Sequence, residues 1–161
     1  MVDFKLKITL SSREIKQVTH RILHWEDVAV GSEIPPVSLE LTQNRIVMAV
    51  CATRDIFPLH NDPEFAIASG YKAPVVAGAF LQGFLERCIT DWTGPKGKLR
   101  KLSLPLRTPN YKGDTLTARG KVIKKYIENG DHRVDCELVI TNQEGVVTVN
   151  AQATVTLPSK T

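Results

Sequence analysis

Residues 73–92, APVVAGAFLQGFLERCITDW, form the most apolar stretch of the chain and decide its fold. The length of this stretch and the lack of a breaker before Gly94 predict one buried helix, from about Val76 to Trp92. A buried helix needs a second layer of structure to cover its apolar surface. The rest of the sequence therefore has to supply that layer.

Four segments after this helix have the composition of strands. They are KLRKLSLPLRTPNY (98–111), DTLTARGKVIKKYI (114–127), HRVDCELVITN (132–142) and VVTVNAQATVTL (146–157). Turn signals separate them at Lys112-Gly113-Asp114, Asn129-Gly130-Asp131 and Gln143-Glu144-Gly145, and all three links suit hairpins or short reversals. The C-terminal half is thus expected to be a run of antiparallel strands. The fold class that follows is α+β, a curved antiparallel sheet around one long central helix.

The part before residue 73 is expected to hold one strand and short helices. Residues 1–24 alternate weakly (DFKLKITL) or have some helical character (SSREIKQVTHRIL), and we assign them to an N-terminal extension, with the domain at 25–161. A Pro-Pro bend is expected to precede a strand at 37–41. A helix over 44–54 follows, capped by Thr42 or Asn44, and a shorter helical segment closes at Gly70.

Composition bounds the class of protein. The 161 residues include 42% hydrophobic and 24% charged side chains, which suits one globular domain with its own core. No apolar run is long enough to span a bilayer, and the N-terminus has no secretory pattern, so we expect a cytosolic protein without membrane contact. The net charge of +4 fits an anionic partner such as coenzyme A, and no nucleic-acid-binding motif is present. The three cysteines are expected to be reduced and buried.

The segment DIFPLHNDPEF (55–65) holds the residues that could carry chemistry. Asp55 and His60 are five residues apart with Pro58 between them, so a short loop can bring a carboxylate and an imidazole to one water molecule. Gly78 falls near the start of the predicted helix, where free N–H groups can hold a developing oxyanion. Each feature also has a structural explanation, because an aspartate often caps a helix and a glycine often serves packing. Spacing alone therefore predicts an α+β enzyme of unknown reaction.

The same stretch resembles the MaoC-like, (R)-specific enoyl-CoA hydratase family, which has the hot-dog fold. The family pattern Asp-x-Asn-Pro-[Leu/Ile/Val]-His is matched by residues 55–60, DIFPLH, and the glycine after a Val/Ile-x pair is matched by VVAG, 75–78. The later segment PNYKGDTL (109–116) is similar to a second family pattern, and the likeness extends from about residue 25 to 157. Phe57 replaces the usual Asn, and Ala77 stands where the family often has His. The segments ATRD and ITDWTGP are most similar to small subunits of steroid side-chain hydratases, which can work in heteromers.

The resemblance implies an acyl-CoA substrate and a dimer-type pairing, either with a second copy or with another MaoC-like chain. Asp55 and His60 would activate water for addition to an enoyl thioester, and the Gly78 amide would bind its carbonyl oxygen. Loss of the polar residue at Phe57 is consistent with a bulky substrate. The charged residues that could meet the phosphates of coenzyme A are Arg100, Lys101, Arg107 and Lys112, and for each of them plain surface solvation is the commoner role. No metal or redox cofactor is expected.

Two other functions remain open at this point. A hot-dog acyl-CoA thioesterase would use the same water for hydrolysis, and a non-catalytic partner subunit would only complete the binding tunnel of a heteromer. The match of both Asp55 and His60 to the hydratase pattern favours hydration. Whether coenzyme A or acyl carrier protein bears the acyl group is not decided by the sequence.

Overall fold

The structure is a computed structural model that describes residues 22–161. The strand and helix expected within the N-terminal extension lie outside the described residues, apart from Ile22, Leu23 and His24. Leu23 is buried and packs with the hydrophobic core. No helix among residues 22–161 is long and apolar enough to cross a membrane.

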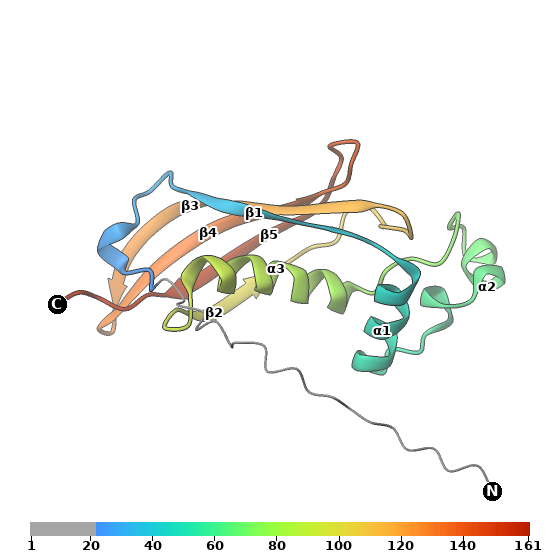
Figure 1. The fold of residues 1–161 in the computed structure, drawn as a ribbon, viewed down its shortest axis with the longest axis horizontal. Coiled ribbons are helices and arrows are strands. Elements are labelled where there is room, and N and C mark those ends of the chain that lie inside the picture. The colour runs from blue at the N-terminus through green and yellow to red at the C-terminus, as the bar shows by residue number, and fades with distance from the viewer. Residues whose placement is uncertain (1–21) are drawn as a thin grey trace, which may run out of the picture.

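The described chain forms five strands, three α-helices and two 3₁₀ turns (Figure 1). In chain order they are η1 (Trp25–Asp27), β1 (Glu33–Glu40), α1 (Gln43–Thr53), η2 (Pro58–His60), α2 (Pro63–Ala68), α3 (Gly78–Thr93), β2 (Lys98–Ser103), β3 (Thr115–Glu128), β4 (Asp131–Thr141) and β5 (Val147–Thr156). The expected α+β class is confirmed, with helices in the first half and most strands in the second.

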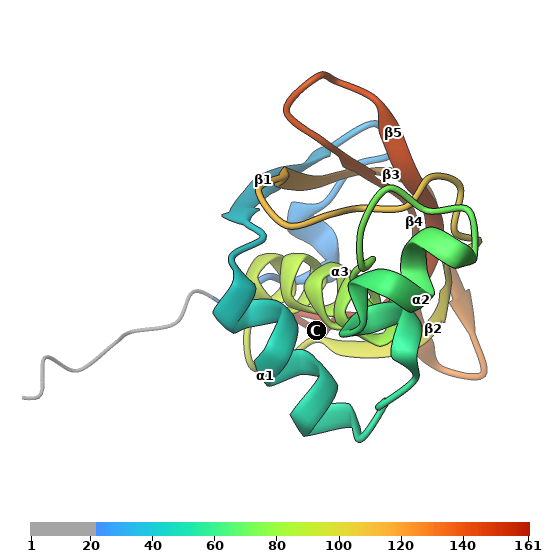
Figure 2. The ribbon, with the colours of Figure 1, turned by 90° about the vertical axis from the view of Figure 1, so that its right-hand side faces the viewer.

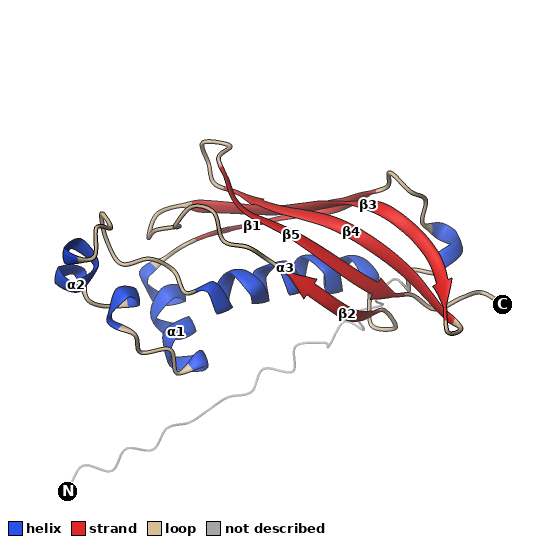
Figure 3. Cartoon of the chain, turned by 180° about the vertical axis from the view of Figure 1, so that it is seen from behind, coloured by secondary structure: helices blue, strands red, loops and turns tan. Residues whose placement is uncertain are grey.

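All strand pairs are antiparallel, and the sheet has the order β1-β3-β4-β5-β2. Seen from either side, the long helix α3 runs along one face of this curved sheet, while α1 and α2 gather at the end where α3 begins (Figures 1 and 3). A sheet curved over a single long helix is the hot-dog architecture that the resemblance implies.

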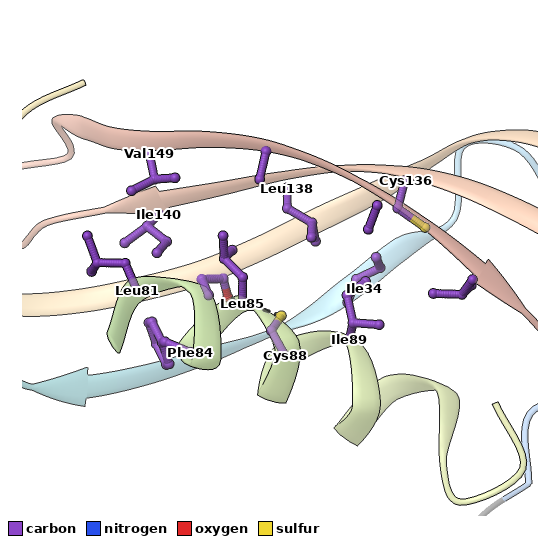
Figure 4. Packing of buried hydrophobic residues seen from close by; sticks show 14 of the residues in the cluster. Ile34, Leu81, Phe84, Leu85, Cys88, Ile89, Cys136, Leu138, Ile140 and Val149 are labelled. Atoms are coloured by element: carbon purple, nitrogen blue, oxygen red, sulfur yellow. Dashed lines mark hydrogen bonds between the residues drawn. The ribbon is translucent and has the colours of Figure 1, made fainter. Parts of the chain in front are cut away.

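The apolar face of α3 makes the centre of the core. Leu81, Leu85, Cys88 and Ile89 recur at helical spacing, are at most 3% exposed, and point towards the sheet (Figure 4). The helix begins at Gly78 and not at Val76 as predicted. Residues 75 and 76 are instead held extended, because Val75 pairs with Tyr111 and the Val76 N–H bonds the Asn110 carbonyl at 3.0 Å.

Strand β1 corrects the expectation of a Pro-Pro bend before the strand. Pro35 and Pro36 lie inside β1, at an irregularity between Ile34 and Val37. Prolines are tolerated there because β1 is an edge strand, where a missing N–H breaks no ladder hydrogen bond on the open side.

The predicted strand at 98–111 is also too long. Only Lys98–Ser103 is a strand, β2, and it pairs with β5 at the far edge of the sheet. Residues 104–114 form a connecting loop that returns the chain to β3, and Lys112-Gly113-Asp114 is its last turn and not a hairpin. The hairpin predicted at Asn129-Gly130 is confirmed: both residues have positive φ, 53° and 80°, as a tight two-residue turn between β3 and β4 requires.

The cysteines differ in exposure, and one expectation was wrong. Cys88 and Cys136 are buried in the core, but Cys51 lies exposed on α1. Burial raises the pKa of the Cys88 thiol to about 11 and that of Cys136 to about 12, so both stay protonated near neutral pH.

We therefore expect only one thiol of the folded protein to react readily with iodoacetamide at pH 8. Mass spectrometry should find the label on Cys51, and Cys51→Ser should remove the rapid reaction, whereas all three thiols should react in denaturant. Rapid labelling of Cys88 or Cys136 in the native protein would contradict the packing described above.

Candidate active site

Helix α1 places Asp55 at the end of the molecule where α3 begins. Thr42 caps α1 by accepting the Arg45 N–H, as predicted, and Arg54 ends the helix in a left-handed conformation with φ 55°. The chain then turns sharply, and the Asp55 N–H bonds the Thr53 hydroxyl at 3.4 Å. The backbone of Asp55 is therefore fixed by the end of α1, and its carboxylate does not lie on a long loop.

His60 is held in place by a backbone carbonyl fifteen residues further along the chain. It is the last residue of η2, which Pro58 opens. Its Nδ1 lies 2.9 Å from the Val75 carbonyl oxygen, and Val75 in turn donates its N–H to the Leu59 carbonyl at 3.1 Å. A carbonyl only accepts hydrogen bonds, so Nδ1 carries a proton and, in the neutral ring, Nε2 is left as an acceptor.

The structure brings Asp55 and His60 together, with Oδ2 of the carboxylate 3.4 Å from Nε2 of the ring. The His60 side chain is 11% exposed and the Asp55 side chain 40%. When the imidazole is neutral, both facing atoms are acceptors, and one water molecule could donate a proton to each of them. Such a water would be polarised towards loss of a proton, which is the task of a general base.

Gly78 is the first residue of α3, as the oxyanion hypothesis requires. No side chain caps this end of the helix, and the Phe80 N–H donates to the Ala77 carbonyl, so the N–H groups of Gly78 and Ala79 are available to a ligand. A Cβ at residue 78 would lie 3.2 Å from Leu106 of the connecting loop, so a larger residue would press against that loop. The segment 75–77 links this helix end directly to the carbonyl that holds His60.

Phe57 lies over the imidazole. Its ring centroid is 6.3 Å from that of His60 and 5.5 Å from that of Phe65 on α2, both in edge-to-face geometry. Half of Phe57 is exposed, and Ile56 beside it is 76% exposed. The approach to the pair is therefore apolar on this side, where the related family has an amide.

The four basic residues predicted to bind coenzyme A divide into two groups. Arg107 and Lys112 lie exposed on the connecting loop. Arg107 follows Leu106, which is close to Gly78. Lys112 follows Tyr111, which pairs with Val75. Arg100 and Lys101 lie on β2, which begins after the other end of α3, a helix about 24 Å long at 1.5 Å per residue. The Arg100 guanidinium is also engaged by Asp131 at 3.4 Å. Neither feature favours a role for Arg100 and Lys101 beside Asp55 and His60.

Some residues of the site were not found from the sequence. Val75 acts through its backbone carbonyl, and Lys72 lies 4.3 Å from the centroid of the Tyr111 ring, adding a third cation near the loop. Asn110 is 1% exposed, and its side-chain amide has no hydrogen-bond partner among the described residues. None of these contacts has a local signal, because each joins segments far apart in the chain.

A metal site built on His60, Asp62 and Asp55 is not favoured by the geometry. Asp62 accepts the N–H groups of Glu64 and Phe65 and so caps α2. Within residues 22–161 no group of three or more His, Cys, Asp or Glu side chains is placed to hold a metal ion. A cavity of about 920 Å³ lies at the opposite end of α3 beside η1 and does not include the pair.

Comparison with known proteins gives one family match over most of the chain. The family described as "MaoC like domain" matches residues 28–146. The β subunit of 3-oxo-4,17-pregnadiene-20-carboxyl-CoA hydratase from Mycobacterium tuberculosis is 36% identical over 93 residues, 58% of this chain and 72% of the relative. The (R)-specific enoyl-CoA hydratase of Aeromonas caviae is 28% identical over 107 residues, 66% of this chain and 78% of the relative.

Among solved structures, the ChsH1-ChsH2 complex from Mycobacterium tuberculosis contains a chain with a similar fold. The TM-score is 0.72 at 30% sequence identity, covering 80% of this chain and 98% of that one. The similar protein is thus a subunit of a complex of two named components.

Proposed function

This chain belongs to the MaoC-like domain family and is an enoyl-CoA hydratase, and from that premise we propose that Asp55 and His60 are its catalytic residues. The observation that carries the proposal is the 3.4 Å approach of the carboxylate to the imidazole Nε2, with Nδ1 fixed on the Val75 carbonyl. This arrangement supplies two acceptors for one water on a rigid support.

In the proposed reaction, the bound water adds its oxygen to C3 of a 2-enoyl thioester. The proton that the water loses passes to the Asp55–His60 pair, and the pair delivers a proton to C2. The carbon–carbon double bond becomes a single bond, C3 gains a hydroxyl group, and the pair returns to its starting state. The reverse sequence is dehydration of a 3-hydroxyacyl thioester. No redox cofactor is required, since no electrons leave the substrate, and in this proposal the Asp55–His60 pair supplies the acid and the base.

The thioester carbonyl becomes more negative as water adds, and Gly78 is the proposed donor to its oxygen. The uncapped first turn of α3 offers N–H groups and the positive end of the helix dipole. A carbonyl polarised in this way draws electrons from C3, which favours attack by the water. A second donor would be the N–H group of Ala79 in the same turn.

We propose a bulky, steroid-type acyl group as the substrate. The 36% identity to the β subunit of a hydratase named for a pregnadiene-carboxyl-CoA supports this, and so does the apolar approach formed by Phe57, Phe65 and Ile56. We also propose that the chain works as a homodimer or with another MaoC-like chain, because a similar chain is found in a two-component complex. A cytosolic location and the lack of a nucleic-acid partner stay predictions from the sequence.

The proposed function is tested by incubating the purified protein with 2-enoyl-CoA thioesters that range from crotonyl-CoA to a pregnadiene-carboxyl-CoA. A gain of one water on the intact thioester is the expected product mass. Release of free coenzyme A would instead identify a thioesterase. Lack of conversion of every substrate would overturn the proposal of a self-sufficient hydratase and favour a chain that needs a partner subunit.

For the coenzyme A phosphates we propose Arg107 and Lys112, and the structure separates them from Arg100 and Lys101. Exposed ion pairs are weak, so Arg107→Ala and Lys112→Ala should each raise KM for crotonyl-CoA about threefold, and about tenfold together. KM for the matching pantetheine thioester, which has no nucleotide phosphates, should not change. Arg100→Ala is the matched control; an equal effect of Arg100→Ala would place the nucleotide on β2 instead.

A further inference from the structure

A groove between α1 and α3 has no role in the site described so far. Its volume is about 460 Å³, within the range of about 300–1,000 Å³ that is usual for ligand pockets. Figures 1 and 2 show α1 beside the end of α3 that begins at Gly78. The walls are mainly apolar and come from facing sides of the two helices: Met48, Ala49 and Ala52 on α1, and Phe80, Gly83 and Phe84 on α3.

Gly83 suggests that the groove is kept open for something outside this chain. It lies in the interior of α3, where glycine weakens a helix relative to alanine. A Cβ built at Gly83 would meet no atom within 4 Å, so no contact among the described residues requires a glycine. By contrast, a Cβ at Gly97 would lie 2.4 Å from Thr93, which explains that glycine within the chain. The loss of helix stability caused by Gly83 has an explanation if a ligand fills the space beside it.

The groove is adjacent to the proposed catalytic pair. Thr53 lines it, and the Thr53 hydroxyl accepts the N–H of Asp55. On the other wall, Phe80 follows the proposed oxyanion donor Gly78 by two residues. A group attached to the reacting carbons therefore has an apolar space within one or two residues of both catalytic elements.

We propose that the α1–α3 groove binds the acyl group of the thioester, and that a fused-ring acyl group fills it. This inference rests on the proposed hydratase function and adds the location of the substrate. A second protein chain is the alternative occupant, and the test below distinguishes it from an acyl group. Met48, which is 69% exposed, would be covered by the bound rings.

One arginine in the lining fits a polar atom on the far part of such a ring system, because the other, Arg45, already donates from its guanidinium to the Glu40 carbonyl oxygen. Arg45 and Arg87 are the charged residues of the groove. Arg87 uses Nε for Asp91, at 3.3 Å, and so keeps its terminal N–H groups for another acceptor. A ring ketone, as in a 3-oxo steroid, accepts hydrogen bonds and carries no charge, so a guanidinium can bind it without an ion pair.

The test compares Gly83→Leu with Gln82→Leu, a control at the exposed neighbouring position of α3 that does not line the groove. The probes are 3-oxo-4-pregnene-20-carboxyl-CoA, which has no double bond conjugated with the thioester, and butyryl-CoA. In calorimetric titrations, Gly83→Leu should weaken binding of the steroid thioester at least tenfold and leave binding of butyryl-CoA within twofold. Gln82→Leu should change neither, and Gly83→Ala should give an intermediate loss with raised thermal stability.

The outcomes separate this inference from the proposed function. If the wild type hydrates enoyl thioesters but Gly83→Leu binds the steroid probe as tightly as Gln82→Leu does, the groove proposal is wrong and the hydratase proposal stands. If the wild type hydrates nothing but Gly83→Leu loses only the steroid probe, the groove proposal stands alone. A changed oligomeric mass of Gly83→Leu without a change in the preference between the two thioesters would identify the groove as a contact with a second chain and overturn the proposal.

Discussion

Asp55→Asn should lower kcat for hydration of crotonyl-CoA by about a thousandfold, equivalent to about 4 kcal/mol of activation free energy. Asparagine keeps the size of the side chain but cannot take a proton from water. The imidazole of His60 would remain fixed on the Val75 carbonyl, so the loss would report the missing carboxylate and not a collapsed loop. Initial rates at saturating substrate measure the effect.

Asp62→Asn is the matched control, because it removes a carboxylate from the same loop. Asp62 caps α2 through its side chain, and asparagine is an equally good cap, so kcat should stay within about twofold. Since residues that act as a unit are not additive, Asp55→Asn combined with His60→Ala should be hardly slower than either single variant. If Asp55→Asn retained a tenth or more of the activity, the assignment of Asp55 would be wrong.

Gly120→Val should destabilise the fold by about 3 kcal/mol or more, at the upper end of what overpacking costs. Gly120 faces the core from β3, and a Cβ there would lie 2.4 Å from Leu138 and 2.6 Å from the backbone oxygen of Glu137. Leu138 is 1% exposed and the oxygen belongs to the neighbouring strand, so neither can move without disturbing the sheet. The midpoint of urea unfolding measures the loss.

The control for this variant is Lys121→Val, at the next position of the same strand. Lys121 is exposed, and valine suits a strand, so the free energy of unfolding should change by about 0.5 kcal/mol or less. Equal stability of Gly120→Val and Lys121→Val would mean that β3 and β4 are further apart than described here.

The parts of the site that lie close together in sequence could be predicted. Asp55 and His60 are separated by one short prolyl turn, and α3 is long enough to be recognised from its apolar character alone. The position of Arg100 could not be predicted, because it depends on which edge of the sheet β2 joins. The hydrogen bond between His60 and the Val75 carbonyl could not be predicted either, since any residue type at position 75 would offer the same backbone acceptor.

Helix α1 illustrates a different limit. Its apolar residues fall on several sides, so the sequence does not decide which of them are buried. In the structure Ile46 and Val50 enter the core, while Val47 and Met48 stay exposed and Cys51 lies on the surface. The incorrect expectation for Cys51 has this origin. The expectation of a bend at Pro35 and Pro36 was wrong for a related reason. Prolines can lie within a strand when that strand is at the edge of its sheet, and the sequence does not show which strand is at the edge.

The two edge strands of the sheet also bear on how the protein behaves in concentrated solution. β1 carries Pro35 and Pro36 at its irregularity, and β2 carries Lys98 and Lys101 and a second irregularity between Leu99 and Lys101. Flat, proline-free strand edges are templates on which folded subunits can polymerise into fibrils. Neither edge offers such a template, so loss of material on storage should follow the rate of unfolding rather than growth of fibres from native subunits.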